Sequence, residues 1–94
     1  MKTRYEVQWC VKLAFNSCGD VDIDNCDMAF LFFPTLPEAR TQAELVWPET
    51  TNTTGLVIVT EQEWDLYGDY EFPTLGRWIN TYNRYIYSGE WEDT

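Results

Sequence analysis

The chain has 94 residues and carries sixteen Asp and Glu against six Lys and Arg, a formal net charge of −10 at pH 7, with no histidine. A negative field of this size repels nucleic acid and anionic membranes and attracts cationic partners. The absence of histidine removes the commonest general base and metal ligand, which disfavours an enzyme. Five Trp, six Tyr and five Phe supply enough apolar surface for a core, so we expect residues 1–94 to form a single domain.

The sequence shows no sign of export or membrane insertion, since no stretch has the uninterrupted apolar core of a secretory signal or of a membrane span. The three cysteines, Cys10, Cys18 and Cys26, form an odd set that favours reduced thiols in a cytoplasmic protein. Their spacing lacks both the short Cys-x2-Cys knuckle and the fourth ligand of a zinc site. We therefore expect no metal and no other cofactor.

A long hairpin is predicted at the N-terminus. Over residues 5–15 the apolar side chains occupy the odd positions, which is the pattern of a strand with one buried face. Turn-forming residues at 16–20 return the chain, so a second strand within 21–33 is expected to pair with the first. The apolar positions of this second leg change from odd to even, which predicts a bulge or long loop near 24–27.

A helix and an inner strand are predicted next. Thr35 and Glu38 have the spacing of a capping box, in which each side chain satisfies a free backbone amide at the start of a helix. Apolar residues then recur at helical spacing until Pro48 prevents continuation, so the helix is expected over 36–46. The β-branched run at 56–59 predicts a strand in the centre of the sheet.

Two further helices are predicted in the C-terminal half. A second capping-box spacing predicts a short helix over 60–68, although an extended conformation is left open there. The apolar residues over 75–86 follow a strongly helical spacing, and Gly89 stands where a left-handed residue would end that helix. This assignment places Trp78 and Tyr82 in the core.

Together these elements predict an α+β fold. An antiparallel sheet of about three strands, with the long N-terminal hairpin, is expected to be covered on one face by two main helices. The last helix, with its bulky apolar stripe, is expected to be the larger part of that cover.

Acidic and aromatic residues gather in three segments that are candidate partner-binding sites. In an extended strand, alternate carboxylates repeat about every 6.6–7 Å, close to two phosphate steps of about 3.4 Å along one DNA strand. A solvated hairpin remains the alternative for the first segment. A calcium loop is disfavoured there because the required Gly and Glu are replaced. The candidate residues are Asp20, Asp22, Asp24 and Asp27 in the first segment; Glu61, Glu63, Trp64, Asp65, Tyr67, Asp69 and Glu71 in the second; and Glu90 and Trp91 in the third.

In its small size, its charge, the aspartates at 20–24 and the acidic-aromatic stretch 61–72, the chain resembles phage-encoded inhibitors of host defence, the anti-CRISPR and DNA-mimic proteins. The likeness is one of overall character and not of a shared motif. It implies a protein without enzymatic activity that blocks the basic nucleic-acid-binding surface of a protein or nucleoprotein complex in the host cytoplasm. Such a protein binds neither nucleic acid nor a membrane itself.

Two other function classes stay open. A cytosolic immunity protein that neutralises a basic nuclease toxin has the same physical character, because it also presents acids to a cationic partner. A small enzyme or ligand-binding protein would need a concave pocket with convergent polar groups. The aromatic residues also leave a homodimer open as the assembly.

Overall fold

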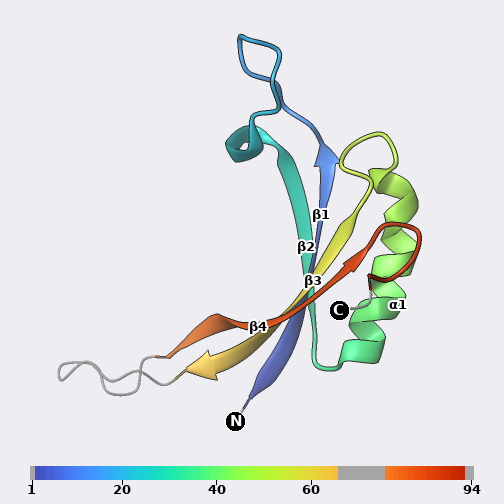
Figure 1. Ribbon diagram of the computed structural model, residues 1–94. Helices are drawn as coiled ribbons and strands as arrows, with labels where there is room; N and C mark the ends of the chain where they lie inside the picture. Colours follow the sequence, from blue (N-terminus) through green and yellow to red (C-terminus); the bar gives the residue numbers. More distant parts are fainter. Residues whose placement is uncertain (1, 66–75, 93–94) are drawn as a thin grey trace, which may run out of the picture.

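Four antiparallel strands and one α-helix make up the part of the chain that the computed structural model describes, residues 2–65 and 76–92 (Figure 1). The expected sheet of three strands under two main helices is therefore wrong, because the described residues of both predicted C-terminal helices belong to strands. The sheet order is β2-β1-β3-β4. The elements are β1 (Thr3–Lys12), a 3-10 turn (Ile23–Asn25), β2 (Asp27–Phe33), α1 (Leu36–Val46), a second 3-10 turn (Trp47–Thr50), β3 (Val57–Asp65) and β4 (Arg77–Tyr87).

Strand β1 lies in the middle of the sheet and pairs on both sides. Tyr5 lies opposite Phe33 of β2 and opposite Glu61 of β3. This pairing confirms the predicted N-terminal hairpin. The irregularity predicted in the second leg of the hairpin is the 3-10 turn Ile23–Asn25. The pairing of β1 with β2 also shifts register between Cys10 and Lys12.

Helix α1 connects the outer strand β2 to the inner strand β3 and covers one face of the sheet (Figure 1). Its predicted bounds are confirmed, but the predicted capping box is wrong, because Thr35 makes no side-chain hydrogen bond to the helix end. Ala39 and Ala43 are fully buried. Such small side chains let the helix backbone approach the sheet closely. The helix contributes Val46 to the core, and the sheet contributes Val7, Trp9, Val57 and Val59. Tyr5, Leu36, Trp47 and Tyr85 are among the side chains at the margin of this core.

The predicted helix over 60–68 is wrong across its described residues, where the extended alternative is correct. Val57 and Val59 are fully buried under α1. The following residues of the same face, from Glu61 onward, continue the strand past the end of the helix (Figure 1). Because the helix does not cover them there, they are polar, and the apolar alternation that marks a strand is lost from the sequence.

The predicted helix over 75–86 is also wrong across its described residues, where β4 begins at Arg77 and contains a bulge. Gln62 and Thr60 of β3 lie opposite Asn80 and Arg84 of β4, so three residues of β4, 81–83, oppose a single residue of β3. The two extra residues leave the alternation in phase, since Asn80 and Arg84 both lie on the face opposite α1. The misleading spacing arises because β4 carries apolar side chains on both faces, Trp78 and Ile86 on one and Ile79 and Tyr85 on the other, and these adjacent pairs imitate helical spacing. The abundance of Trp, Ile, Thr and Tyr in the segment favours strand.

The two residues that the helical assignment placed in the core lie elsewhere. Tyr82 is in the bulge and is fully exposed, and Trp78 is half-buried on the face opposite α1. Gly89 does have the expected left-handed backbone, with φ of 95°, but it belongs to the turn after β4.

The burial pattern predicts that Val59→Ala lowers the free energy of unfolding by about 2 kcal/mol, because two buried methyl groups are removed beneath α1. Leu45→Ala, on the outer side of the same helix where Leu45 is 69% exposed, should change it by less than about 0.5 kcal/mol. Urea unfolding followed by tryptophan fluorescence measures both. Equal losses in the two variants would show that α1 does not pack through its alanine face.

Candidate protein-binding surface

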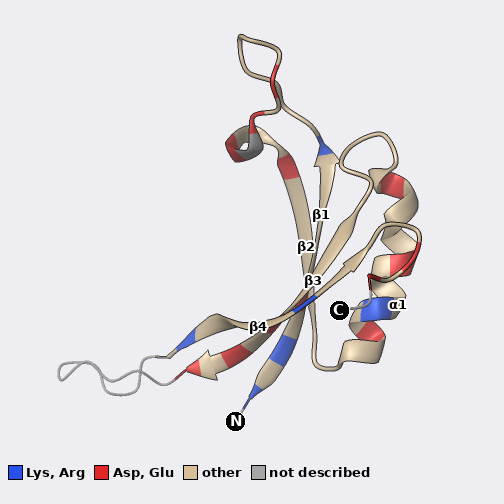
Figure 2. Ribbon diagram, viewed as in Figure 1, with Lys and Arg blue, Asp and Glu red and all other residues tan. Residues whose placement is uncertain are grey.

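The acidic and aromatic residues of β3 lie on opposite faces of the sheet. Glu61, Glu63 and Asp65 share the face on which Val57 and Val59 are buried under α1. Figure 2 shows these acidic positions along the part of β3 that extends beyond the helix. The mixture of acids and rings seen in the sequence is therefore two separate surfaces in the fold.

The three carboxylates form a row with regular spacing. Alternate residues of a strand are about 6.6–7 Å apart, which is close to two phosphate steps of about 3.4 Å on a DNA strand. Asn83 in the β4 bulge donates a hydrogen bond from its amide to the Glu61 carboxylate and orients it. Glu63 lies between the uncharged Thr3 and Ile79, whereas Asp65 lies opposite Arg77.

The electrostatic effect of this carboxylate row is evident at Tyr5. Burial raises the pKa of the Tyr5 hydroxyl above its ordinary value of 10.0, and the negative charge of Glu61 raises the pKa further, as does Tyr85. Tyr5 is also the direct cross-strand neighbour of Glu61. The Glu61 carboxylate therefore acts on groups next to it through a partly desolvated surface.

The aspartates of the hairpin do not form the extended row that the sequence suggested. The 3-10 turn Ile23–Asn25 interrupts the segment, and Asp22 accepts a hydrogen bond of 2.6 Å from the Asn25 amide. Asp20, Asp24 and Asp27 are exposed at the far end of the hairpin, away from the acids of β3 (Figure 2). The spacing proposed for the hairpin is realised on β3 instead.

The third predicted segment contributes to packing. The half-buried Trp91 ring contacts Tyr87 at a centroid distance of 5.0 Å, and its indole N–H donates a 3.1 Å hydrogen bond to Glu44 of α1. Glu90 is exposed in the turn that follows β4. The predicted site residues Tyr67, Asp69 and Glu71 lie outside the described residues.

The face opposite α1 carries a cationic and aromatic cluster that the sequence did not reveal. The Arg4 guanidinium lies 3.8 Å from the centre of the Phe32 ring and 4.2 Å from that of Trp78. Trp64 joins this cluster, with its ring 5.4 Å from that of Trp78. Contacts of this kind stabilise a cation at a surface by about 0.5–1 kcal/mol each.

Hydrogen bonds join this cluster to the sheet. Arg4 donates to the side-chain oxygen of the buried Gln62, and Gln62 donates to Asn80, each at 2.8 Å. The exposed Phe30 extends the aromatic surface along β2, with its ring 5.9 Å from that of Phe32. In the sequence, only the apolar residues at even positions in the second leg of the hairpin, 21–33, indicated an apolar surface on the face opposite α1.

No protein-family model, curated protein or solved structure matches the chain. In residues 2–65 and 76–92, no helix combines the length and the apolar character that crossing a membrane requires. The same residues bring no three histidine, cysteine or carboxylate side chains together as a metal site. Function is therefore argued from the surfaces themselves.

The raised pKa of Tyr5 predicts how stability depends on pH. Because the folded state holds this hydroxyl neutral, its contribution to stability is complete below pH 10 and is lost as the pH rises through the folded pKa. Glu61→Gln should lower the pKa of Tyr5 and weaken this alkaline loss of stability. NMR titration of the labelled tyrosine ring carbon, combined with urea unfolding above pH 10, measures both effects.

Glu63→Gln is the matched control, since it removes the same charge from the same row but next to Thr3. It should shift the Tyr5 titration less than Glu61→Gln does. An equal shift would mean that Tyr5 senses only the overall charge of the protein.

Proposed function

We propose that the protein is an acidic inhibitor, without enzymatic activity, that binds the cationic nucleic-acid-binding surface of another protein or nucleoprotein complex. The observation that carries this proposal is the row formed by Glu61, Glu63 and Asp65 on one face of β3. Its spacing of about 6.6–7 Å is close to the repeat of every second phosphate on a DNA strand.

The overall charge supports the same function. Sixteen acidic residues outweigh six basic ones, so the protein attracts cationic surfaces over several ångströms before contact. Two of the six basic side chains are also held against rings. Arg4 lies between Phe32 and Trp78, and Arg40 lies 5.1 Å from the centre of the Tyr85 ring and 5.0 Å from that of Trp91.

Inhibition would be competitive. Lys and Arg side chains that otherwise bind phosphate would pair with the carboxylates of β3, and Arg would do so through two parallel hydrogen bonds. Ile79, which is 37% exposed, and the half-buried Tyr5 flank the row and offer apolar contact. Trp64 lies on the opposite face, so it does not act as the aromatic anchor beside these acids.

This proposal places the protein with the DNA-mimic inhibitors of the phage type, which act on anti-viral or DNA-processing complexes in the host cytoplasm. Its three cysteines are free thiols, which agrees with a reducing compartment. An immunity protein against a basic nuclease would use the same acidic row on a different target.

Two triple variants with the same change in charge test the proposal. One replaces the row on β3 with Glu61→Gln, Glu63→Gln and Asp65→Asn. The other replaces the hairpin acids with Asp20→Asn, Asp22→Asn and Asp24→Asn. Each removes three of the sixteen acidic groups. Wild type and both variants serve as bait in a nuclease-treated bacterial lysate, and each bound protein is then challenged with duplex DNA.

We expect the β3 variant to slow association with the bound protein by about tenfold or more at low salt, and the hairpin variant to slow it much less. Duplex DNA should displace the bound protein, and binding should weaken with salt because exposed charges are screened beyond about 8 Å at physiological ionic strength. Equal association rates for the two variants would reject the row on β3. A bound protein that DNA cannot displace would reject nucleic-acid mimicry.

A further inference from the structure

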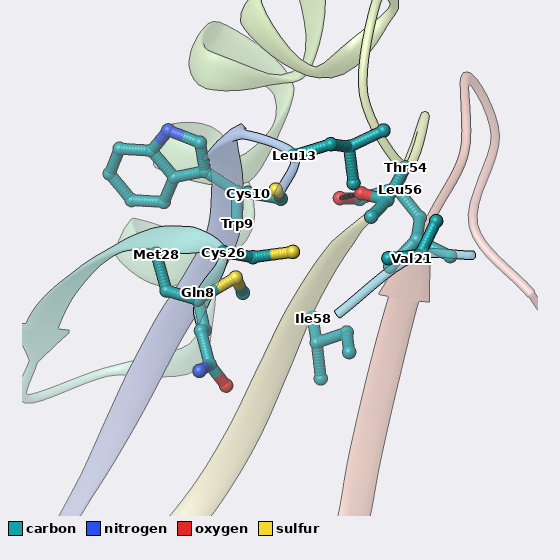
Figure 3. Close-up of a pocket in the computed structure, with 10 residues that line it drawn as sticks. All are labelled: Gln8, Trp9, Cys10, Leu13, Val21, Cys26, Met28, Thr54, Leu56 and Ile58. Carbon is teal, nitrogen blue, oxygen red and sulfur yellow. Dashed lines mark hydrogen bonds between the residues drawn. The ribbon is translucent and has the colours of Figure 1, made fainter. Parts of the chain in front are cut away.

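An apolar cavity of about 200 Å³ lies on the sheet face opposite α1, at the end nearest the hairpin loop (Figure 3). Leu56 and Ile58 of the β3 side form one part of its wall, and Leu13 and Val21 of the hairpin loop form another. Nearly all of the exposed atoms in this lining are apolar. The cavity is separate from the acidic row on β3, so a ligand bound in it is independent of the proposed function.

Three sulfur-bearing side chains meet in this cavity. Cys10 lies directly opposite Met28 in the β1–β2 register, so the two side chains are on the same face and about 4.5–5.5 Å apart at their Cβ atoms. Cys26 comes two residues before Met28, and all three residues line the cavity. Figure 3 shows their sulfur atoms gathered on the same side of the cavity.

The two thiols interact with each other. Burial raises the pKa of the Cys10 thiol, and the charge of Cys26 and a hydrogen bond with it raise that pKa further. Hydrogen bonds from the Thr53 hydroxyl and the Lys12 amide oppose this rise. The net effect is a raised pKa, so the two sulfur atoms lie close together in a site that holds the Cys10 thiol neutral in the absence of a cation.

Backbone groups hold the second sulfur as well. The Ala14 amide donates a hydrogen bond of 3.4 Å to Cys26 Sγ, and Cys26 Sγ donates one of 3.2 Å to the Asp22 carbonyl. Of these two bonds only the one from the Ala14 amide can persist to a metal-bound thiolate, because the bond to the Asp22 carbonyl uses the proton that metal binding releases. The register shift between Cys10 and Lys12 is a further irregularity of the kind found next to functional sites.

We propose that Cys10, Cys26 and Met28 form a binding site for Cu(I). Two thiolates and one thioether are soft ligands, and soft ligands select Cu(I) among biological metal ions. Structural zinc sites take four nitrogen or sulfur ligands, and this cavity supplies only two thiols and a thioether.

The position of the three sulfur atoms suits loading by a small ion. Met28 is 40% exposed and Cys26 is half-buried, whereas Cys10 is only 1% exposed. A Cu(I) ion would therefore reach the exposed thioether before the buried thiol. Binding releases the protons of the two thiols, so the affinity falls as the pH is lowered.

Competition with a chromogenic Cu(I) chelator, bathocuproine disulfonate, tests this site under reducing, oxygen-free conditions. Wild-type protein should withdraw one equivalent of Cu(I) per chain. Cys26→Ser should weaken binding by more than about 100-fold, since loss of an outer-layer partner alone costs 10–100-fold. Met28→Leu keeps the size of an exposed side chain and so preserves the fold. Met28→Leu should also weaken Cu(I) binding, and X-ray absorption should show one sulfur neighbour fewer around the copper ion.

Cys18→Ser is the matched control, because Cys18 is an exposed thiol of the hairpin loop that does not line the cavity. It should leave Cu(I) binding unchanged. Three results would each overturn the proposal: wild-type protein that leaves all Cu(I) on the chelator, equal losses in Cys18→Ser and Cys26→Ser, or Met28→Leu with unchanged affinity and unchanged sulfur coordination. Titration of free thiols on the same samples identifies any Cys10–Cys26 disulfide, which would take up no metal and count against the site.

Discussion

The register of β1 between its two neighbours is the constraint on which the rest of the structure depends. β1 is paired along both edges, so shifting β1 by one residue against its neighbours would move each of its side chains to the other face of the sheet. In the observed register Val7 and Trp9 meet Val57 and Val59 under α1. The same register places Arg4 beside Gln62 and Cys10 opposite Met28 on the other face. Core, aromatic cluster and sulfur cavity are thus consequences of a single alignment.

The length of the sheet relative to the helix explains why the two faces differ in chemistry. α1 covers only part of its face, and β3 continues past it with Glu61, Glu63 and Asp65 (Figure 1). Those positions cannot be apolar without exposing a hydrophobic patch to water. No helix of the described residues covers the opposite face, where the rings of Phe32 and Trp78 hold Arg4 and two hairpin-loop residues, Leu13 and Val21, help to line the cavity with the sulfur atoms. The surface proposed for a cationic partner and the site proposed for a soft metal ion therefore lie on opposite faces of the sheet.

The sequence predicted a helix or strand correctly where one hydrophobic periodicity described its whole length. The first strand of the hairpin and the helix at 36–46 each keep one periodicity, and the structure confirms both, together with the inner strand that the β-branched run at 56–59 predicted. β4 carries apolar side chains on both faces, and β3 becomes polar where the helix no longer covers it, so neither segment shows a simple alternation and both imitate helices. The acidic residues could be named from the sequence, but their face could not, because it depends on strand register. The pairing of Cys10 with Met28 is likewise invisible in the even spacing of the cysteines.

Nuclear Overhauser contacts in the labelled protein test the central register most directly. The structure predicts contacts between Tyr5 and Glu61 and between Trp64 and Trp78, together with slow amide exchange along both edges of β1. Contacts displaced by one residue, with Tyr5 opposite Thr60 or Gln62 instead of Glu61, would show a different register of β1. That result would move the side chains of β1 to the other face and contradict the account.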